Sequence, residues 1–224
     1  MKIRFVVGFQ TASSIEYDPL MDSEQHWQRV YTTKGEGDTS WFEAVPAASL
    51  RLLEAAGLTA ATCVVDIGGG DSRLVDTLAA RGLDCLAVLD VSSAALGRAR
   101  LRMGDAQRVP TWITADVTGD WALKPMDIWH DRAVFHFLTA HEDRLRYVRH
   151  MRETVKVNGS AIIATFAPDG PERCSGLPVV RYSPDALAQE LGPSFLLVQS
   201  VRHRHITPRG IEQSFQYSRF VRVH

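Results

Sequence analysis

Residues 64–75 read VVDIGGGDSRLV, a run in which strand-like residues lead through glycines into helical ones. The apolar and β-branched residues of 64–67 are typical of a buried strand. Gly68 and Gly70 permit the positive φ angles of a tight turn, and the helix that follows leaves free N–H groups at its start. A strand, a glycine turn and a helix in this order are typical of a nucleotide-binding α/β fold.

An acidic residue further along the chain supports this interpretation. Residues 85–90, CLAVLD, form a second apolar strand that ends in Asp90, twenty residues after Gly70. A carboxylate at this place can accept hydrogen bonds from both hydroxyls of a ribose. Together, the glycine turn and Asp90 predict a bound nucleotide-like cofactor more strongly than the turn alone.

The charges around the turn distinguish between cofactors. A dinucleotide fingerprint would place a third glycine at position 73, where this chain has Arg73. It would also bring Asp71 close to a negatively charged pyrophosphate. S-adenosylmethionine has no phosphate and carries a sulfonium and an ammonium group, so Asp66 and Asp71 suit its charge. The turn therefore favours S-adenosylmethionine over NAD or FAD.

The segment DIGGG at 66–70 resembles the (D/E)xGxG motif of the class I S-adenosylmethionine-dependent methyltransferases. Ser72 stands where many members have a further glycine, and the resemblance covers roughly residues 45–224. It implies an α/β, Rossmann-like seven-stranded sheet in the order 3-2-1-4-5-7-6, with an antiparallel last strand and helices on both faces. It also implies methyl transfer to a small molecule or a protein side chain.

Composition is consistent with one folded domain at 46–224 preceded by an N-terminal cap or lid at 1–45. The 224 residues are 45% hydrophobic and 23% charged, which is enough to bury a core. The net charge of −1 predicts no overall attraction to nucleic acid or to an anionic membrane. Cys63, Cys85 and Cys174 lack metal-ligand spacing, and their odd number makes a disulfide framework improbable. The N-terminal apolar run is too short to span a membrane. Together with the cysteine usage, it predicts a reducing, cytoplasmic setting.

The cap shows little periodicity and carries Trp27, Tyr31 and Trp41. Such aromatic residues can form an apolar lid over a ligand or can pack the segment onto the sheet. Under the first interpretation, Trp27 and Tyr31 contact the cofactor. Between them and Trp41, residues 34–38, KGEGD, predict a mobile loop.

Periodicity and turn residues place the other elements. Helices are expected at 46–57, 73–80, from 92 onward, at 142–157 and at 183–192, and strands at 111–115, 126–131, 160–166, 195–201 and 213–223.

The resemblance assigns roles to residues that follow these strands. Val91 would line the adenine and ribose, Asp116 would accept the adenine amino group, and the N–H of Val117 would donate to the ring. Asp116 alternatively caps a turn. The full set of expected cofactor-binding residues is Asp66, Gly68, Gly69, Gly70, Asp90, Val91, Asp116, Val117, Asp131, Trp27 and Tyr31.

Three residues are candidates for catalysis. Asp131 follows the fourth strand, at the sheet edge where open α/β folds bind ligands, and could orient the cofactor or accept a proton from the acceptor. His136 could act as a base because imidazole titrates near neutral pH. Alternatively, Asp131 caps a helix and His136 is satisfied in the packing. Cys174 lies in the Pro- and Gly-rich loop 167–178, which either contacts substrate or is a stiffened surface connection.

No metal site is expected. His203, His205 and Cys174 form a conceivable zinc set, but a His-x-His pair on a strand is typical of solvent-facing alternation. The basic residues around this pair, together with Arg209, are interpreted as a solvated hairpin tip. One available cysteine is too few for a site built on several thiolates.

The acceptor is left open by the sequence. The aromatic cap is most similar to small protein-lysine methyltransferases that act on citrate synthase and elongation factor 1A, while small-molecule acceptors, including thiols and metalloid species, are equally compatible with a compact chain. Two competing classes are a non-catalytic S-adenosylmethionine-binding module and an NAD-dependent oxidoreductase. Arg73 and the acidic turn disfavour the second.

Overall fold

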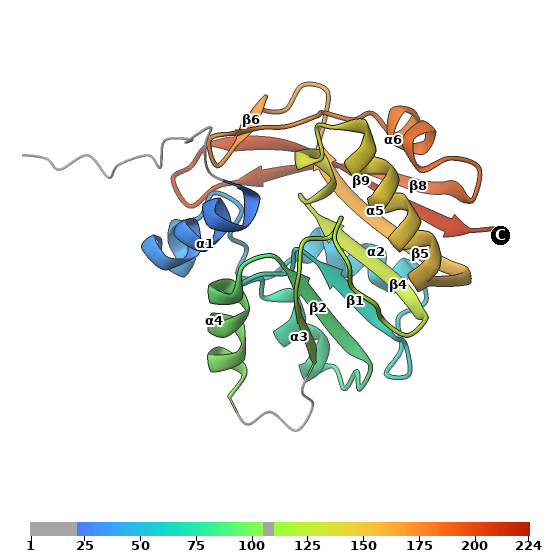
Figure 1. The fold of residues 1–224 in the computed structure, drawn as a ribbon, viewed down its shortest axis with the longest axis horizontal. Coiled ribbons are helices and arrows are strands. Elements are labelled where there is room, and N and C mark those ends of the chain that lie inside the picture. Colours follow the sequence, from blue (N-terminus) through green and yellow to red (C-terminus); the bar gives the residue numbers. More distant parts are fainter. Residues whose placement is uncertain (1–21, 105–109) are drawn as a thin grey trace, which may run out of the picture.

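A computed structural model describes residues 22–104 and 110–224 (Figure 1). The N-terminal apolar run and the first part of the expected cap, residues 1–21, lie outside the described residues. The helices are α1 Ser23–Thr33, α2 Ala47–Ala55, α3 Leu74–Ala80, α4 Ser93–Met103, α5 His141–Thr154 and α6 Pro184–Leu191, with 3-10 turns η1 Glu36–Asp38 and η2 Phe135–Phe137. The strands are β1 Val64–Ile67, β2 Leu86–Asp90, β3 Thr111–Thr114, β4 Met126–Arg132, β5 Val155–Phe166, β6 Arg173–Cys174, β7 Leu177–Pro178, β8 Phe195–Ile206 and β9 Glu212–Arg222.

The main sheet has the order β3-β2-β1-β4-β5-β9-β8. Strands β1 to β5 pair in parallel, and β9 runs antiparallel to both of its neighbours. If β8 and β9 are counted as the sixth and seventh strands of this sheet, the order is 3-2-1-4-5-7-6. The expected Rossmann-like topology with an antiparallel last strand is therefore confirmed.

Helices cover both faces of the sheet (Figure 1). One core cluster joins α2, α3 and α4 to the face that carries Val64 and Val88, and the other joins α5 and α6 to the face that carries Val65 and Leu89. Burial on both faces explains why the central strands are continuously apolar. The parallel arrangement brings the carboxyl ends of β1, β2 and β4 to one edge, where the glycine turn lies.

The cap contains a helix that sequence periodicity does not predict. Helix α1 begins after Asp22, whose side chain accepts a hydrogen bond from the N–H of Gln25 at 2.8 Å. The prediction of a mobile loop at 34–38 is also wrong, because these residues include the 3-10 turn η1. Glu36 in that turn forms ion pairs with the guanidinium groups of Arg73 and Arg102. These charges hold the segment against α3 and α4.

The boundary between α5 and β5 differs from the prediction of a helix up to Val157. The helix ends at Thr154 and β5 begins at Val155, because β-branched residues favour the strand. The buried face of α5 carries Tyr147 and Met151, whereas Leu145 is 49% exposed.

The expectation that the cysteines form no disulfide is wrong. Cys63 and Cys85 are bonded, with Cα atoms 4.5 Å apart, and Cys174 is free. The two residues immediately precede β1 and β2, whose parallel register pairs Val64 with Leu86 and so sets the cysteines side by side. The prediction of a reducing setting rests on the expectation that the cysteines form no disulfide, and the bond between Cys63 and Cys85 removes this support. Among the described residues, no helix is long and apolar enough to cross a membrane.

Candidate active site

The glycine turn after β1 is shaped so that side chains cannot replace its glycines. Gly68 has a φ of +61° and Gly70 a φ of +48°. A Cβ added at Gly68 would lie 2.0 Å from a methyl carbon of Val134, and one at Gly70 would lie 2.8 Å from the Tyr31 hydroxyl and 2.9 Å from Asp90 Oδ2. The backbone of this turn therefore lies in close contact with the side chains around it, and we call residues 68–70 the glycine cradle.

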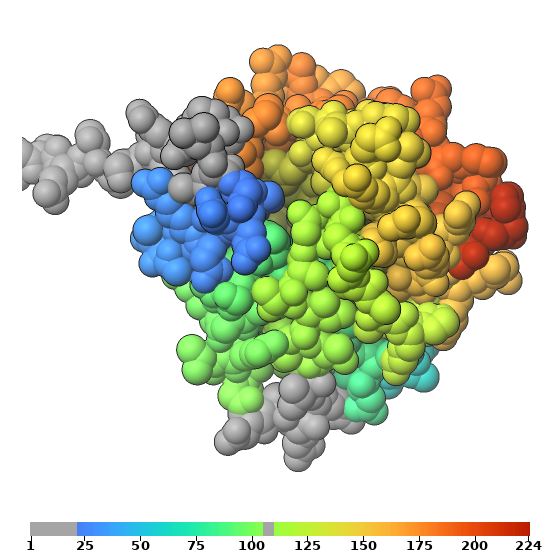
Figure 2. Space-filling model, viewed as in Figure 1, coloured from blue at the N-terminus to red at the C-terminus, as the bar shows by residue number. Residues whose placement is uncertain are grey.

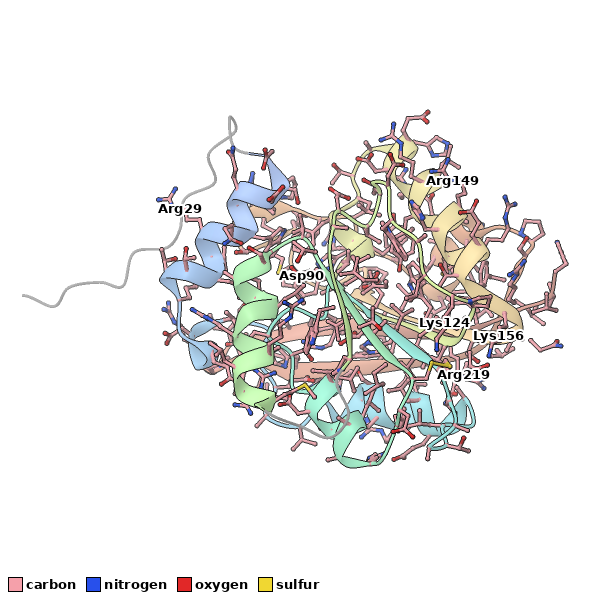
Figure 3. The ribbon with its side chains drawn as sticks, turned by 60° about the horizontal axis from the view of Figure 1, so that its bottom comes forward. Arg29, Asp90, Lys124, Arg149, Lys156 and Arg219 are labelled. Carbon is pink, nitrogen blue, oxygen red and sulfur yellow. A yellow bond between two sulfur atoms is a disulfide. The ribbon has the colours of Figure 1, made fainter. Side chains whose placement is uncertain are left out.

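Asp90 is buried at the end of β2, on the side of the molecule nearest α1, whereas Lys124, Lys156 and Arg219 lie at the opposite end (Figure 3). Its Oδ1 accepts a hydrogen bond from the N–H of Ser92 at 2.8 Å. Burial raises the pKa of Asp90 to about 7, the carboxylate of Asp66 adds to the rise, and the Ser92 amide opposes it. A buried carboxylate with Oδ2 facing the turn can accept hydrogen bonds from ribose hydroxyls.

A cavity runs from this turn to the cap. The residues that line it are Ser23, Trp27, Tyr31, Trp41, Gly68, Leu89, Asp90, Val91, Ala115, Asp116, Val117, Arg132, Ala133, Val134, Phe137, Leu138, Cys174, Gln213 and Phe215. The expected Val91, Asp116 and Val117 are thus brought together with Asp90 on one side. Asp116 also caps a turn, since its Oδ1 accepts hydrogen bonds of 2.7 Å from the N–H and the hydroxyl of Thr118.

Another part of the cavity wall is aromatic. The ring centroid of Trp27 lies 5.6 Å from that of Trp41 and 5.1 Å from that of Phe137, and Tyr31 lies 6.2 Å from Trp41. These rings pack on one another in edge-to-face arrangements and also line the cavity. The packing role considered for the cap aromatics is therefore observed, and their contact with a cofactor stays a prediction.

Helix α1 is fastened to the start of α4, which follows Val91. The Gln28 side-chain oxygen accepts hydrogen bonds from the Ser92 hydroxyl at 2.9 Å and from the N–H of Ala94 at 3.2 Å. Arg98 of α4 donates to the carbonyl of Lys34 at 2.7 Å. In the space-filling view, the blue atoms of α1 lie against the green atoms of the segment that includes α4 (Figure 2). Helix α1 therefore packs on α4 and contributes Ser23, Trp27 and Tyr31 to the cavity lining.

Asp66 does not line the cavity. It pairs across β1 and β4 with His130, and its Oδ1 lies 2.7 Å from His130 Nδ1. The other ring nitrogen lies 2.8 Å from the hydroxyl of Ser49, and all three side chains are buried. A Cβ at Gly69 would come 2.7 Å from Asp66 Oδ2. The Asp66 side chain therefore packs against the glycine turn without lining the cavity.

Asp71 also lies outside the cavity that Asp90 lines. Its carboxylate forms an ion pair with Arg102, which in turn binds Asp76 at 2.8 Å, and Arg98 approaches Asp71 to 3.8 Å. The charge of Asp71, which favours S-adenosylmethionine in the sequence argument, is therefore largely compensated by arginines.

Asp131 and His136 are buried outside the cavity lining. Asp131 accepts hydrogen bonds from the N–H groups of Val134 and Phe135 and from the Tyr147 hydroxyl, at 2.8, 3.0 and 2.6 Å. These bonds fix the turn after β4, as in the structural alternative considered for Asp131. Burial lowers the pKa of His136 to about 3, and the nearby charge of Arg132 adds to this effect.

Cys174 lines the cavity from the ribbon of β6 and β7, a pairing within the loop 167–178 that sequence reasoning treats as irregular. Burial raises the pKa of this thiol to about 12, although Arg132 and Lys34 oppose the rise. The thiol is therefore neutral near physiological pH. Arg173 of the same loop is exposed and does not line the cavity.

Sequence reasoning missed Arg132, which also lines the cavity. Its guanidinium donates to the carbonyl of Trp41 at 2.8 Å and to the Tyr217 hydroxyl at 3.1 Å. It also pairs with Glu43 at 3.1 Å and lies 5.4 Å from the ring centroid of Phe215. The only sequence signal is its position next to Asp131 at the end of a strand that reaches the ligand-binding edge.

Comparisons with known proteins agree with this geometry. A family model described as a methyltransferase domain matches residues 65–161. A comparison with curated proteins finds no match.

Solved structures provide further matches. A structure from work on the conversion of a disulfide bond into a thioacetal group during echinomycin biosynthesis is 19% identical, with a TM-score of 0.71, and the match covers 88% of this chain and 91% of the other. The N-methyltransferase NodS from Bradyrhizobium japonicum WM9, in complex with S-adenosyl-L-homocysteine, is 16% identical, with a TM-score of 0.68 and coverages of 91% and 100%. The 1,6-didemethyltoxoflavin-N1-methyltransferase from Burkholderia thailandensis is 16% identical, with a TM-score of 0.64 and coverages of 90% and 84%. These likenesses show a shared fold.

Proposed function

The chain carries a class I S-adenosylmethionine-dependent methyltransferase domain, and from this premise we propose that it methylates a small, mainly apolar molecule at a nitrogen atom. The acceptor nitrogen reacts in its neutral form. Two features support this proposal: the aromatic enclosure of the acceptor side and the absence of a suitable base among its described lining residues.

The cofactor side fits S-adenosylmethionine. The glycine cradle would hold its amino-acid part, Asp90 would accept the ribose hydroxyls, and Val91 with Val117 would contact the adenine. Asp116 lines the same end of the cavity with an exposed carboxylate. When bound, S-adenosylmethionine supplies an electrophilic methyl group whose bond to sulfur breaks as the acceptor lone pair forms the new bond, so that sulfur keeps the electron pair.

The acceptor side offers enclosure instead of acid–base chemistry. Trp27, Trp41 and Phe137 exclude water from one wall and present aromatic surfaces to positive charge, which moves to the acceptor nitrogen during transfer. Gln213 supplies an amide that can hydrogen-bond to a polar group of the acceptor. A flat or apolar molecule matches this lining better than a highly charged one.

The protonation states of the lining side chains limit which atom of an acceptor can be methylated. The Cys174 thiol is neutral because its pKa is about 12, and Arg132 is a paired cation. Among the described lining residues, the carboxylates are Asp90 and Asp116, both on the cofactor side. An alcohol or an ammonium group would need a base for proton removal, whereas a neutral nitrogen attacks directly with its lone pair; the product keeps the positive charge or, if the nitrogen bears a hydrogen, releases a proton to water.

Two of the similar structures are N-methyltransferases, which is consistent with this acceptor class. The non-catalytic alternative predicts cofactor binding without turnover. A protein-lysine acceptor would have to reach a cavity to whose lining α1 contributes Ser23, Trp27 and Tyr31, and this enclosure favours a small molecule.

The proposal is tested by supplying S-adenosylmethionine with a panel of heteroaromatic nitrogen compounds, aliphatic amines, thiols and lysine-containing proteins, and by measuring S-adenosylhomocysteine. We expect turnover with the heteroaromatic nitrogen compounds. Trp41→Ala should raise KM for that acceptor about tenfold, because it removes one wall of the enclosure. Trp112→Phe on β3, outside the cavity lining, is the matched control. Turnover with proteins alone, or binding without any turnover, would contradict the proposal.

A further inference from the structure

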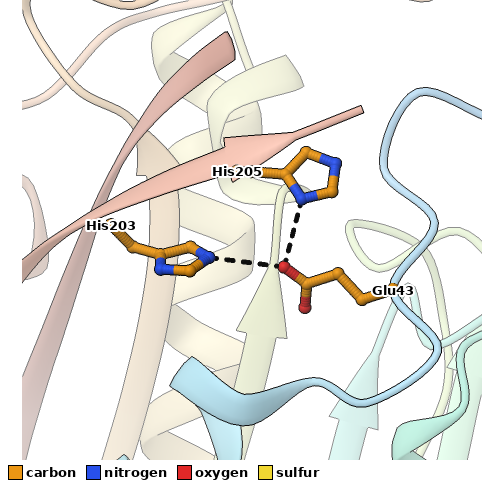
Figure 4. Close-up of side chains that lie close together, drawn as sticks. All are labelled: Glu43, His203 and His205. Carbon is orange, nitrogen blue, oxygen red and sulfur yellow. Dashed lines mark hydrogen bonds and ion pairs between the residues drawn. The ribbon is translucent and has the colours of Figure 1, made fainter. Parts of the chain in front are cut away.

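Three potential metal ligands meet where the segment before α2 lies against β8 (Figure 4). Glu43 contributes a carboxylate, and His203 and His205 contribute one ring nitrogen each, with all three ligand atoms within 4.8 Å of one another. Glu43 Oε1 lies 3.4 Å from His203 Nε2 and 3.2 Å from His205 Nδ1. This group lies outside the cavity lining and has no role in the proposed methyl transfer.

The strand presents the two histidines to the protein instead of to solvent. His203 and His205 are two residues apart on β8 and therefore project from the same face, while Arg202 and Arg204 are exposed on the other. His205 is buried, with only 3% of its surface exposed. The expectation of a solvated hairpin tip is therefore wrong for this residue.

The hydrogen bonds of His205 place the lone pair of one ring nitrogen opposite a carboxylate oxygen. Its Nε2 lies 2.7 Å from the carbonyl oxygen of Ser40, so this nitrogen carries a proton and donates it. In a neutral imidazole, Nδ1 then holds a lone pair that points toward Glu43 Oε1. Two electron-rich atoms at 3.2 Å repel each other unless a proton or a cation lies between them. In addition, Glu43 Oε2 is buried and has no hydrogen-bond partner.

We propose that Glu43, His203 and His205 bind a divalent transition-metal ion of the zinc class. Zinc bonds of about 2.0–2.2 Å to nitrogen and oxygen, arranged tetrahedrally, separate neighbouring ligand atoms by roughly 3.3 Å. The two separations from Glu43 Oε1, 3.2 and 3.4 Å, match this spacing, and the ligand atoms of the two histidines lie within 4.8 Å of each other. A ring N–H donated to a backbone carbonyl, as Ser40 accepts it here, is the usual way to orient a metal-binding histidine.

The surroundings leave room for a further ligand and set the affinity. A shallow hollow lined by Phe42, Ala44 and Val45 adjoins the three side chains, so water can complete the coordination. The guanidinium group of Arg132 lies 3.1 Å from Glu43 Oε1, and its positive charge repels a dication at this site. We therefore expect micromolar affinity. Binding would fix the segment that carries Trp41 to β8.

The experiment uses the full chain freed of metal. Zn²⁺ is titrated in competition with a chromophoric chelator, and Co²⁺ is used to record the visible absorption of a four-coordinate site. We expect stoichiometric binding, a cobalt spectrum of tetrahedral type, and a higher melting temperature with Zn²⁺. His203→Gln should weaken Zn²⁺ binding more than about tenfold, and Glu43→Gln should do the same.

His141→Gln, at the exposed start of α5, is the matched control and should bind Zn²⁺ like the original chain. His203 is partly exposed, so His203→Gln should keep the fold, which circular dichroism and S-adenosylhomocysteine binding check independently of the metal. Absence of stoichiometric Zn²⁺ binding would overturn the proposal, as would equal affinity of His203→Gln and the original chain. Either result would assign the group to an ion pair between Glu43 and a protonated His205.

Discussion

The two sides of the cavity are built differently. The cofactor side comes from residues at the carboxyl ends of β1, β2 and β3 or directly after them, so its geometry is set by the backbone of the sheet and its turns. The acceptor side combines α1, the segment around Trp41, the β6–β7 ribbon and β9, which are far apart in the sequence. The first kind of surface is fixed locally, and the second depends on long-range packing. The comparison teaches that the shape of the cofactor side depends on local turn geometry, whereas the shape of the acceptor side depends on how several distant segments pack together.

The largest expected effect is on the cofactor side. Gly68→Ala places a methyl group 2.0 Å from a methyl carbon of Val134 at a φ of +61°. Strain and overpacking of about 2–4 kcal/mol should weaken S-adenosylhomocysteine binding about 100-fold in calorimetric titration. Adding Val134→Ala removes the clash and should restore part of the affinity. Unchanged binding by Gly68→Ala would show that the turn adapts and is not a rigid cradle.

Asp90→Ala should have the next largest effect. Loss of hydrogen bonds to the buried carboxylate costs about 1.5–3 kcal/mol, which corresponds to roughly 10- to 100-fold weaker S-adenosylmethionine binding. Asp116→Ala, whose carboxylate is exposed, should lose less affinity. If both variants bind like the original chain, the assignment of Asp90 to the ribose fails.

A smaller effect follows from protonation of Asp90. Its pKa is raised to about 7, so the carboxyl group is mostly protonated at pH 6 and mostly ionised at pH 8. Ribose hydroxyls donate to the ionised form, and binding should therefore strengthen about tenfold as the pH rises across this range. Affinity measured in buffers of constant ionic strength checks this sign. Asp90→Asn should abolish the dependence, and a dependence that persists would point to another group.

The smallest expected effect concerns the acceptor side. Cys174→Ser changes a buried neutral thiol whose pKa is about 12. Because a neutral thiol takes no part in proton transfer, kcat should stay within about twofold, while KM for the acceptor changes modestly through packing. A loss of kcat of about 100-fold would restore Cys174 as a catalytic group and would make the acceptor side chemically active.

The same contrast explains what could be predicted from the sequence. The glycine turn and Asp90 are found because strand-to-turn geometry is a local signal, and the sheet order follows from the family resemblance. Helix α1 is not predicted because its sequence, SEQHWQRVYTT, shows little hydrophobic periodicity, although Asp22 gives an N-cap signal that identifies its start. Arg132 and Glu43 could not be assigned, because their meeting depends on the packing of distant segments.

Other misreadings have physical causes as well. Asp131 and His136 stand at the expected edge of the sheet, but a side chain's direction depends on the turn that follows, and here both turn inward. The pair of Cys63 and Cys85 could have been anticipated, because both residues immediately precede neighbouring parallel strands.

The bond between Cys63 and Cys85 gives the cofactor motif an unusual topology. It joins the beginnings of β1 and β2, so the glycine turn and α3 lie within one covalent ring of chain. In the unfolded state the ring keeps its ends together and removes about 3 kcal/mol of loop-closure entropy from the cost of pairing the two strands. A cut in the backbone anywhere inside this ring leaves the polypeptide in one covalent piece. The segment proposed to bind the cofactor would therefore stay covalently attached to the rest of the chain after a single cut within it.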